Sequence, residues 1–320
     1  MGYRQRCELH IFRQGERLNY AMLRPGTKER YIINSFQAGA PAIQIAMPKL
    51  LAALNGSKEL GEKLFRVDFL TSLSGELCIT LVYHRPLDNN WELEAELVRQ
   101  RLGCRLIGRS RKQKVTLGGD YVTEQLAVHG KVFKTRQIEG SFTQPNALVN
   151  REMLEWAVES AEGIGGDLLE LYCGNGNFTL PLSRKFEKVL ATEISKTSIA
   201  ALEWGMQENQ IDNIVCARLS AAEACSAIKR ERPFRRLENI DLDSYQFSTL
   251  FVDPPRAGLD DQTLAWASSF DNVIYVSCNP ETLAQNMEEL GKTHRIERFA
   301  CFDQFPFTPH LEVAVKLVQK

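Results

Sequence analysis

Apolar and polar residues alternate over short runs in the first 140 residues of the chain. Residues 7–23 and 65–84 each contain two alternating runs on either side of a glycine-containing turn, which is the pattern of a β-hairpin. Residues 42–64 and 88–103 have helical spacing instead, with Pro48 as the expected break in the first helix. The pattern predicts a compact, mostly β domain with a few helices added.

Beyond residue 145, strands and helices alternate. An amphipathic helix over residues 150–163 comes first. Seven apolar runs of strand length follow it: residues 167–173, 188–194, 214–219, 248–255, 272–278, 295–302 and 311–318. A helical segment follows each of the first five runs, which predicts a parallel sheet covered by helices on both faces. The last two runs, with no helix between them, predict a hairpin at the sheet edge. We expect domains over residues 1–140 and 141–320.

Composition excludes several classes of protein. The chain is 44% hydrophobic and 25% charged, as is ordinary for a soluble enzyme. No apolar run approaches the ~18 residues of a membrane span, and the first residues lack the apolar stretch of a signal peptide. Eight cysteines are present without a C-x-x-C pair, which disfavours a zinc ribbon or an iron–sulfur cluster and indicates reduced thiols. We therefore expect a cytoplasmic protein with no metal and no membrane contact.

The net charge of −1 hides an asymmetry between the two halves. The first 140 residues carry 22 Lys and Arg against 14 Asp and Glu, whereas the remaining residues carry 17 against 26. Residues 101–114 contain six cations and no acid. Such a run fits contact with a nucleic acid and a solvated strand–loop surface about equally well. On the first interpretation, Arg109, Arg111 and Lys112 are candidate RNA contacts.

The first apolar strand of the second half runs into Gly174-Asn175-Gly176. In an open α/β sheet this loop faces the ligand crevice, and glycines let the backbone approach a ligand closely. A dinucleotide-binding loop needs a third glycine where Thr179 stands. Glu193 ends the next strand, where a carboxylate can accept hydrogen bonds from both ribose hydroxyls of an adenosine. Together these residues favour S-adenosylmethionine over NAD, which is the chief alternative.

Asp253-Pro254-Pro255-Arg256 follows the fourth strand of this half. Two prolines stiffen the loop and hold Asp253 in place. Enzymes that methylate exocyclic amines have an aromatic residue after a similar acid-Pro-Pro loop. Arg256 stands there instead, which argues against amine methylation and supplies a phosphate or base contact. A stiffened turn with a capping Asp explains the loop about equally well.

Cys278 ends the fifth strand, immediately before Asn279 and Pro280, which are favoured at a helix start. The positive end of the helix dipole is expected to lower the pKa of the thiol, which makes Cys278 a candidate nucleophile. Cys173, in the glycine loop, is the second cysteine to consider. Glu312 precedes the last apolar strand, and the pattern alone favours a solvated acid at the strand edge.

Four segments, LLELYCGNGNFTL, FVDPPR, YVSCNPETLAQN and FDQFPFTPHLE, occur in this order. Together they resemble the RNA uracil-5-methyltransferases, and over nearly the whole chain the tRNA (uracil-5-)-methyltransferases. The resemblance implies a class I methyltransferase domain, Rossmann-like with a seven-stranded mostly parallel sheet, and an N-terminal, mostly β RNA-binding domain. It also implies roles for residues matching the family motifs. These are Cys278 as nucleophile, Glu312 as general base, Arg256 near the uridine, and Gln144, Tyr172, Gly174, Asn177, Glu193 and Asp253 at the S-adenosylmethionine site.

The function implied is methyl transfer to C5 of a uridine in tRNA, giving 5-methyluridine at position 54 of the T loop through a covalent adduct between Cys278 and C6. The partner would be the tRNA T-arm, or another structured RNA with a T-loop-like uridine. Fuller members of the family have a further N-terminal segment, so we expect a truncated chain. The chain has neither the iron–sulfur cysteine cluster nor the added RNA-binding barrel that ribosomal-RNA relatives often carry, which favours tRNA.

An NAD-dependent oxidoreductase is disfavoured by Thr179 and by the lack of an evident hydride-transfer partner, and three further alternatives remain. A ribosomal RNA uracil-5-methyltransferase would use the same motifs. A 5-methylcytosine enzyme would be expected to carry a second cysteine in the acid-Pro-Pro loop, and residues 253–256 contain none. A non-catalytic RNA-binding or RNA-folding protein would explain the basic half but not the set of Cys278, Asp253 and Glu312.

Overall fold

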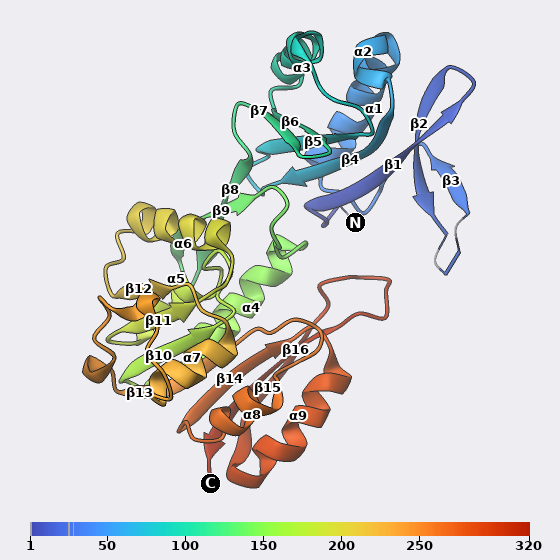
Figure 1. The fold of residues 1–320 in the computed structure, drawn as a ribbon. Coiled ribbons are helices and arrows are strands. Elements are labelled where there is room, and N and C mark those ends of the chain that lie inside the picture. Colours follow the sequence, from blue (N-terminus) through green and yellow to red (C-terminus); the bar gives the residue numbers. More distant parts are fainter. Residues whose placement is uncertain (1, 25, 28) are drawn as a thin grey trace. The chain divides into compact units, whose positions relative to one another are not determined.

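The computed structural model describes residues 2–24, 26–27 and 29–320, which fold into two compact units (Figure 1). Unit 1 comprises residues 1–125 and 137–147, and unit 2 comprises residues 126–136 and 148–320. The strands β8 (Tyr121–Val128) and β9 (Lys131–Ile138) form a two-stranded sheet that is divided between them. The outer ends of this hairpin belong to unit 1, and its turn belongs to unit 2.

Unit 1 contains a seven-stranded sheet with the order β3-β2-β1-β4-β5-β6-β7. Its strands are β1 (Arg6–Gln14), β2 (Arg17–Leu23), β3 (Arg30–Ile33), β4 (Leu64–Thr71), β5 (Leu77–Tyr83), β6 (Arg105–Ser110) and β7 (Gln113–Leu117). Both predicted hairpins, β1–β2 and β4–β5, are confirmed. Only β5 and β6 pair in parallel in this sheet, and α3 (Asn89–Leu102) connects them. This helix ends at Gly103, which adopts the left-handed conformation.

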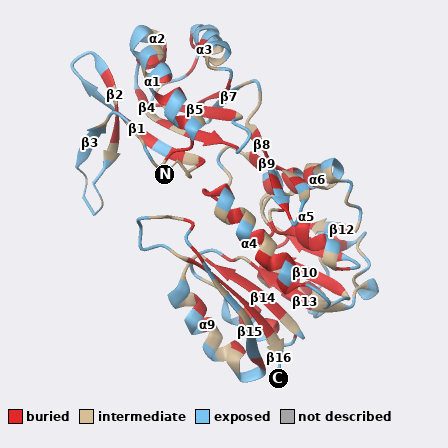
Figure 2. Cartoon of the chain, turned by 180° about the vertical axis from the view of Figure 1, so that it is seen from behind, coloured by how far each residue is buried: buried red, intermediate tan, exposed pale blue. Residues whose placement is uncertain are grey.

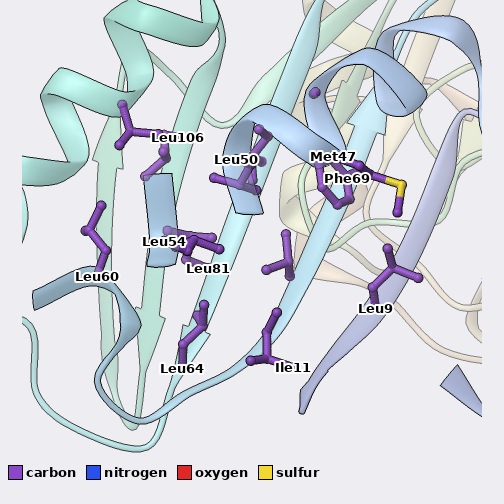
Figure 3. Close-up of a cluster of buried hydrophobic side chains, with 14 of the residues drawn as sticks. Leu9, Ile11, Met47, Leu50, Leu54, Leu60, Leu64, Phe69, Leu81 and Leu106 are labelled. Atoms are coloured by element: carbon purple, nitrogen blue, oxygen red, sulfur yellow. The ribbon is translucent and has the colours of Figure 1, made fainter. Parts of the chain in front are cut away.

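One face of this sheet is covered by α1 (Pro41–Gly56), α2 (Lys58–Gly61) and α3. Figure 3 shows Met47, Leu50 and Leu54 of α1 above side chains of β1, β4 and β5, all of them buried. The expected break at Pro48 is wrong, because α1 runs through it. Proline removes one backbone hydrogen bond, but the buried face of α1 on both sides of Pro48 outweighs that loss.

The opposite face of the unit 1 sheet is polar. Side chains alternate across a strand, so Glu8 and His10 of β1 lie opposite the buried Leu9. Arg66 and Asp68 of β4 continue this face, and Arg66 forms ion pairs with both acids. Unit 1 therefore presents a charged sheet surface beside its apolar core.

Unit 2 contains a seven-stranded sheet with the order β12-β11-β10-β13-β14-β16-β15. Its strands are β10 (Asp167–Leu171), β11 (Val189–Thr192), β12 (Ile214–Ala217), β13 (Phe247–Val252), β14 (Asn272–Ser277), β15 (His294–Phe302) and β16 (Glu312–Gln319). The first five in spatial order are parallel to one another. β16 runs antiparallel to β14, and β15 runs antiparallel to β16. The seven predicted strands, the parallel sheet and the edge hairpin are confirmed. Figure 2 shows the inner strands β10, β11, β13, β14 and β16 as the buried centre of the unit.

Helices lie on both faces of the unit 2 sheet (Figure 1). They are α4 (Ala147–Ser160), α5 (Thr179–Leu182), α6 (Lys196–Asn209), α7 (Ala221–Ile228), α8 (Asp261–Ala267) and α9 (Pro280–Thr293), with 3-10 turns at Ser183–Lys185, Arg235–Leu237 and Leu242–Ser244. The last three α-helices share one apolar cluster with the sheet. On the other face, Phe178 before α5 packs against Phe251 of β13, and Trp156 of α4 packs against Phe302 of β15. Within the described residues, no helix combines the length and the apolar character needed to cross a membrane.

Candidate active site

The chemistry-bearing residues of unit 2 gather at one edge of its sheet because of the strand register. Leu171 of β10 pairs with Thr192 of β11 and with Val252 of β13. The residues that follow these three, Tyr172, Glu193 and Asp253, therefore emerge side by side. The five parallel strands all end here, and their carboxyl ends form the edge at which open α/β sheets bind ligands.

The same edge brings Cys278 and Glu312 together. Ser277, the last residue of β14, pairs with Val313 of β16. Because β16 runs antiparallel to β14, the residue after Ser277 lies beside the residue before Val313. Cys278 and Glu312 would therefore form the next pair of the ladder. The structure thus places a thiol and a carboxyl from distant parts of the sequence on adjacent strands.

The glycine loop has the conformation that a close-fitting ligand site needs. Tyr172, Gly174 and Gly176 have φ of 60°, 55° and 85°, all in the left-handed region. A Cβ on Gly176 would lie 2.4 Å from a Leu202 methyl carbon, so this glycine is required by packing. A Cβ on Gly174 would meet no heavy atom within 4 Å. The space beside Gly174 is therefore open to a ligand, as the S-adenosylmethionine prediction requires.

Glu193 holds the loop from the neighbouring strand. Its Oε2 accepts a hydrogen bond from the Gly174 N–H at 3.2 Å, and its Oε1 accepts one from the Ser195 N–H at 2.8 Å. The carboxylate is only partly buried, and each oxygen has a further lone pair. Glu193 can therefore orient the loop and still accept hydrogen bonds from ligand hydroxyls.

Two asparagines of the loop are tied to other elements, which the sequence analysis missed. Asn177 exchanges two amide hydrogen bonds with Asn150 of α4, at 2.8 and 2.9 Å. Asn175 donates from Nδ2 to the backbone oxygen of Arg136 in β9 at 2.8 Å. Asn150 begins the amphipathic helix recognised in the sequence, but its pairing depends on the folded position of α4. These contacts fix the loop before any ligand binds.

The acid-Pro-Pro-Arg loop leaves β13 at the same edge. Burial and the neighbouring Glu312 raise the pKa of Asp253 to about 8. Arg256 is exposed. Its positive charge acts to lower the pKa of both Cys278 and Glu312, against the stronger effects that raise them. The loop thus supplies a carboxyl that holds a proton near neutral pH and a cation that faces the thiol.

The structure contradicts the expected pKa of Cys278. Asn279 does cap α9, with Oδ1 accepting the Glu281 N–H at 3.2 Å, so the thiol does precede a helix N-terminus. Burial and the charges of Glu312 and Asp253 nevertheless raise the pKa of Cys278. The prediction of a lowered pKa was wrong because it considered only the helix, whereas the two carboxyls arrive from β13 and β16.

Glu312 is also not the solvated acid that the pattern favoured. Glu312 is 4% exposed. Burial raises its pKa to about 7, although the positive charge of Arg256 acts to lower it. A carboxyl with a pKa near the working pH can accept a proton from a substrate and release it afterwards. Cys173, in contrast, is buried, and burial raises its pKa well above the ordinary value. Of these two cysteines, Cys278 is the one with an accessible, partly buried thiol.

The remaining candidate residues lie in unit 1. Gln144 is 7% exposed. Arg109 forms two hydrogen bonds with the carboxylate of the buried Glu139, at 2.7 and 2.6 Å. Arg111 and Lys112 form the exposed turn between β6 and β7 and make no ion pair with any residue that the structure describes. The last two cations are thus available to a polyanion, while Arg109 also holds its own fold together.

Three rings form a row on the polar face of the unit 1 sheet. Phe65 of β4 lies between His10 of β1 and His84, with ring centroids 5.5 Å and 4.7 Å apart. Burial, aided by the charges of Arg30 and Arg66, lowers the pKa of His10, which favours the neutral ring. Sequence analysis missed this row, because nothing local marks three rings from distant parts of the sequence as neighbours. Flat rings beside arginines are a surface on which unpaired bases can stack.

Comparison with known proteins adds a family. The family model described as tRNA (Uracil-5-)-methyltransferase matches residues 1–320. A tRNA/tmRNA (uracil-C(5))-methyltransferase of Saccharophagus degradans is 52% identical over 320 residues, covering 99% of this chain and 88% of the relative. One of the same name from Teredinibacter turnerae is 54% identical over 318 residues, covering 98% and 87%.

A solved structure confirms the expected fold class. The Pyrococcus abyssi tRNA (uracil-54, C5)-methyltransferase in complex with S-adenosyl-L-homocysteine superposes with a TM-score of 0.74 at 21% identity. The match covers 99% of this chain and 76% of that chain. Both the mostly parallel sheet and the strand-rich N-terminal part therefore occur together in a protein of this fold.

Proposed function

The chain belongs to the tRNA (uracil-5-)-methyltransferase family, and from this premise we propose that it methylates C5 of a uridine in tRNA, using S-adenosylmethionine. The observation that carries the proposal is the meeting of Cys278 and Glu312 on adjacent strands, next to Asp253 and the glycine loop. Uracil C5 is a poor nucleophile, and a thiol paired with a carboxyl is the set that overcomes this. NAD chemistry would leave both groups without a role.

The residues around the glycine loop fit S-adenosylmethionine. Gly174 leaves open space for it, and Glu193 has acceptor capacity for ribose hydroxyls. By the family motif, Tyr172, Asn177 and Asp253 would complete the site within unit 2. When bound, this cofactor supplies the methyl group.

The chain's own residues would act on the uracil in sequence. Cys278 loses its proton to water, and its Sγ forms a bond to C6, which makes C5 nucleophilic. C5 then forms its bond to the methyl group while the bond from that methyl to the cofactor's sulfur breaks, with S-adenosylhomocysteine as the leaving group. Glu312 accepts the proton that leaves C5, and the bond between Sγ and C6 breaks to restore the aromatic base and the thiolate. A raised pKa suits Glu312 to this proton transfer.

We further propose that the target is the uridine at position 54 of the T loop, the position named for the Pyrococcus enzyme. A loop uridine costs less to unstack than one in a duplex, and a base must leave its stack to reach Cys278. Unit 1 would bind the T-arm, and unit 2 would carry out the transfer. We place the reaction in the cytoplasm, in keeping with eight free cysteines.

Two features of unit 1 support RNA binding. The ring row of His10, Phe65 and His84 would stack on unpaired bases. Arg111 and Lys112 would contact phosphates, which makes binding weaken steeply with salt. Arg109 is a weaker candidate for such contact, because its guanidinium is engaged by Glu139.

The test is release of tritium from tRNA labelled at uracil C5, with S-adenosylmethionine present. The native chain should release tritium, and Cys278→Ala should not. Glu312→Gln should accumulate a methylated RNA adduct that survives denaturant. Release by Cys278→Ala would refute the nucleophile. Release from ribosomal RNA fragments but not from tRNA would move the substrate and keep the chemistry, and RNA binding without release from any RNA would favour a binding protein.

A further inference from the structure

The Asp253–Leu259 loop is attached to α9 at two points. The backbone oxygen of Arg256 accepts hydrogen bonds from Asn279 Nδ2 at 3.2 Å and from Thr282 Oγ1 at 3.1 Å. Further along, the Leu259 N–H donates to Asn286 Oδ1 at 3.2 Å. Because α9 begins immediately after Cys278, these bonds join the loop that carries Arg256 to the helix that follows the thiol.

Thr282 contributes to this attachment with both branches of its side chain. Its hydroxyl holds the Arg256 carbonyl, and Asn279 Nδ2 also donates to that hydroxyl at 2.5 Å. Its methyl carbon lies where it would be 2.4 Å from a Cβ placed on Gly258. Gly258 has φ of 76°, so the loop approaches α9 with a residue that has no side chain to keep them apart. The first turn of α9 and the loop therefore pack as one piece.

The position of the loop matters for the charge around Cys278. Glu312 on β16 and Asp253 after β13 face the thiol and disfavour the thiolate, whereas Arg256 favours it. Arg256 also faces Glu312. Its side chain is exposed, so the place of the guanidinium depends on the backbone beneath it.

We propose that Thr282 is a positioning residue of this active site, whose hydroxyl and methyl hold the loop against α9 and so set the distance between the Arg256 guanidinium and the Cys278 thiol. The proposal rests on the proposed role of Cys278 as nucleophile. Thr282 would itself touch neither RNA nor S-adenosylmethionine.

The direct test measures the Cys278 thiol without any substrate. The rate of alkylation by iodoacetamide is followed from pH 7 to 11 by mass spectrometry of the Cys278 peptide, for the native chain, Thr282→Val and Thr282→Ser. The Val variant keeps the methyl and loses the hydroxyl, so its midpoint should move up by about half a pH unit, for a guanidinium that retreats ~2 Å from the thiol. The Ser variant keeps the hydroxyl and should retain the native midpoint.

The matched control is Thr293→Val, at the other end of the same helix. Thr293 Oγ1 donates to the Leu290 carbonyl oxygen at 3.3 Å and lies 2.8 Å from His294 Nδ1, so this variant also removes the hydroxyl contacts of a threonine of α9. It should leave the alkylation midpoint unchanged. A midpoint that moves equally in both Val variants would mean that only the stability of α9 matters, and would overturn the proposal.

A double substitution tests whether Thr282 acts through the arginine. Arg256→Gln should raise the midpoint by itself, and adding Thr282→Val should raise it no further. If Thr282→Val raised the alkylation midpoint as much together with Arg256→Gln as it does alone, the proposal would be refuted. It would also be refuted if Thr282→Val did not move the midpoint while Arg256 is present. If the Val variant does not fold, Thr282→Ala removes both contacts without added volume and must show the same displacement.

Turnover separates this inference from the proposed function. With tRNA and S-adenosylmethionine, Thr282→Val should move the pH profile of kcat/KM to higher pH and leave the RNA Kd unchanged. If the native chain releases no tritium from any RNA, the proposed function fails. The alkylation series still decides whether Thr282 sets the environment of the thiol.

Discussion

The buried carboxyl of Glu312 makes a prediction about stability as well as activity. Burial raises its pKa from an ordinary 4.5 to about 7 in the folded chain. Between these values the folded state binds a proton that the unfolded state has lost, so stability falls as pH rises through this window. Above pH 7 the carboxylate is ionised in both states, and the full penalty of burying it remains.

The size of the penalty follows from the two pKa values. A separation from 4.5 to about 7 corresponds to about 3 kcal/mol. Glu312→Gln has the same shape and no charge to bury. Relative to the native chain, it should gain about 2–3 kcal/mol of unfolding free energy on going from pH 5 to pH 8.5, while it loses turnover.

The assay is urea unfolding of the native chain and Glu312→Gln at four values between pH 5 and 8.5. Glu152→Gln serves as the control, because Glu152 is an exposed carboxyl on α4 and its removal changes no buried charge. Its difference from the native chain should not change with pH. A Glu312→Gln variant whose stability relative to the native chain is constant, or falls at high pH, would refute the burial argument.

Three further predictions concern turnover, the glycine loop and RNA. The kcat/KM should rise with pH through about 7, where Glu312 loses its proton, and should go on rising above that pH because burial and two carboxyls raise the pKa of Cys278 further; a flat profile from pH 6 to 8 would contradict this. Gly174→Ala should fold but weaken S-adenosylmethionine binding at least tenfold in calorimetry, because its Cβ would fill open space. Gly176→Ala should lower the melting temperature more than Gly174→Ala, since both variants share the strain of a left-handed φ and only Gly176→Ala adds a clash; the reverse order would exclude the proposed cofactor site. Charge reversal at Arg111 and Lys112 should raise KM for tRNA more than it lowers kcat and flatten the salt dependence of Kd, and an unchanged salt slope would place the RNA elsewhere.

Local pattern was sufficient for most of the fold. Alternation of period two and helical spacing predicted both hairpins of unit 1 and every strand of unit 2, because each pattern reports which face of one element is buried. The order of strands and helices was enough for a parallel sheet with a hairpin at its edge. Local pattern predicted a helix break at Pro48 wrongly, since the packing of α1 outweighs a lost backbone hydrogen bond.

Local pattern also predicted part of the candidate site and missed the rest. Sequence alone marked the glycine loop, Asp253 and Cys278, because turn residues and helix caps leave local signatures. It gave Glu312 the wrong environment and Cys278 the wrong direction of pKa. Both errors have one cause: the burial and charge at a residue come from whatever the sheet order places beside it, and β14 and β16 become neighbours only in the tertiary structure. The sequence therefore determined which groups are present and where each strand ends, and the fold decided which charges meet.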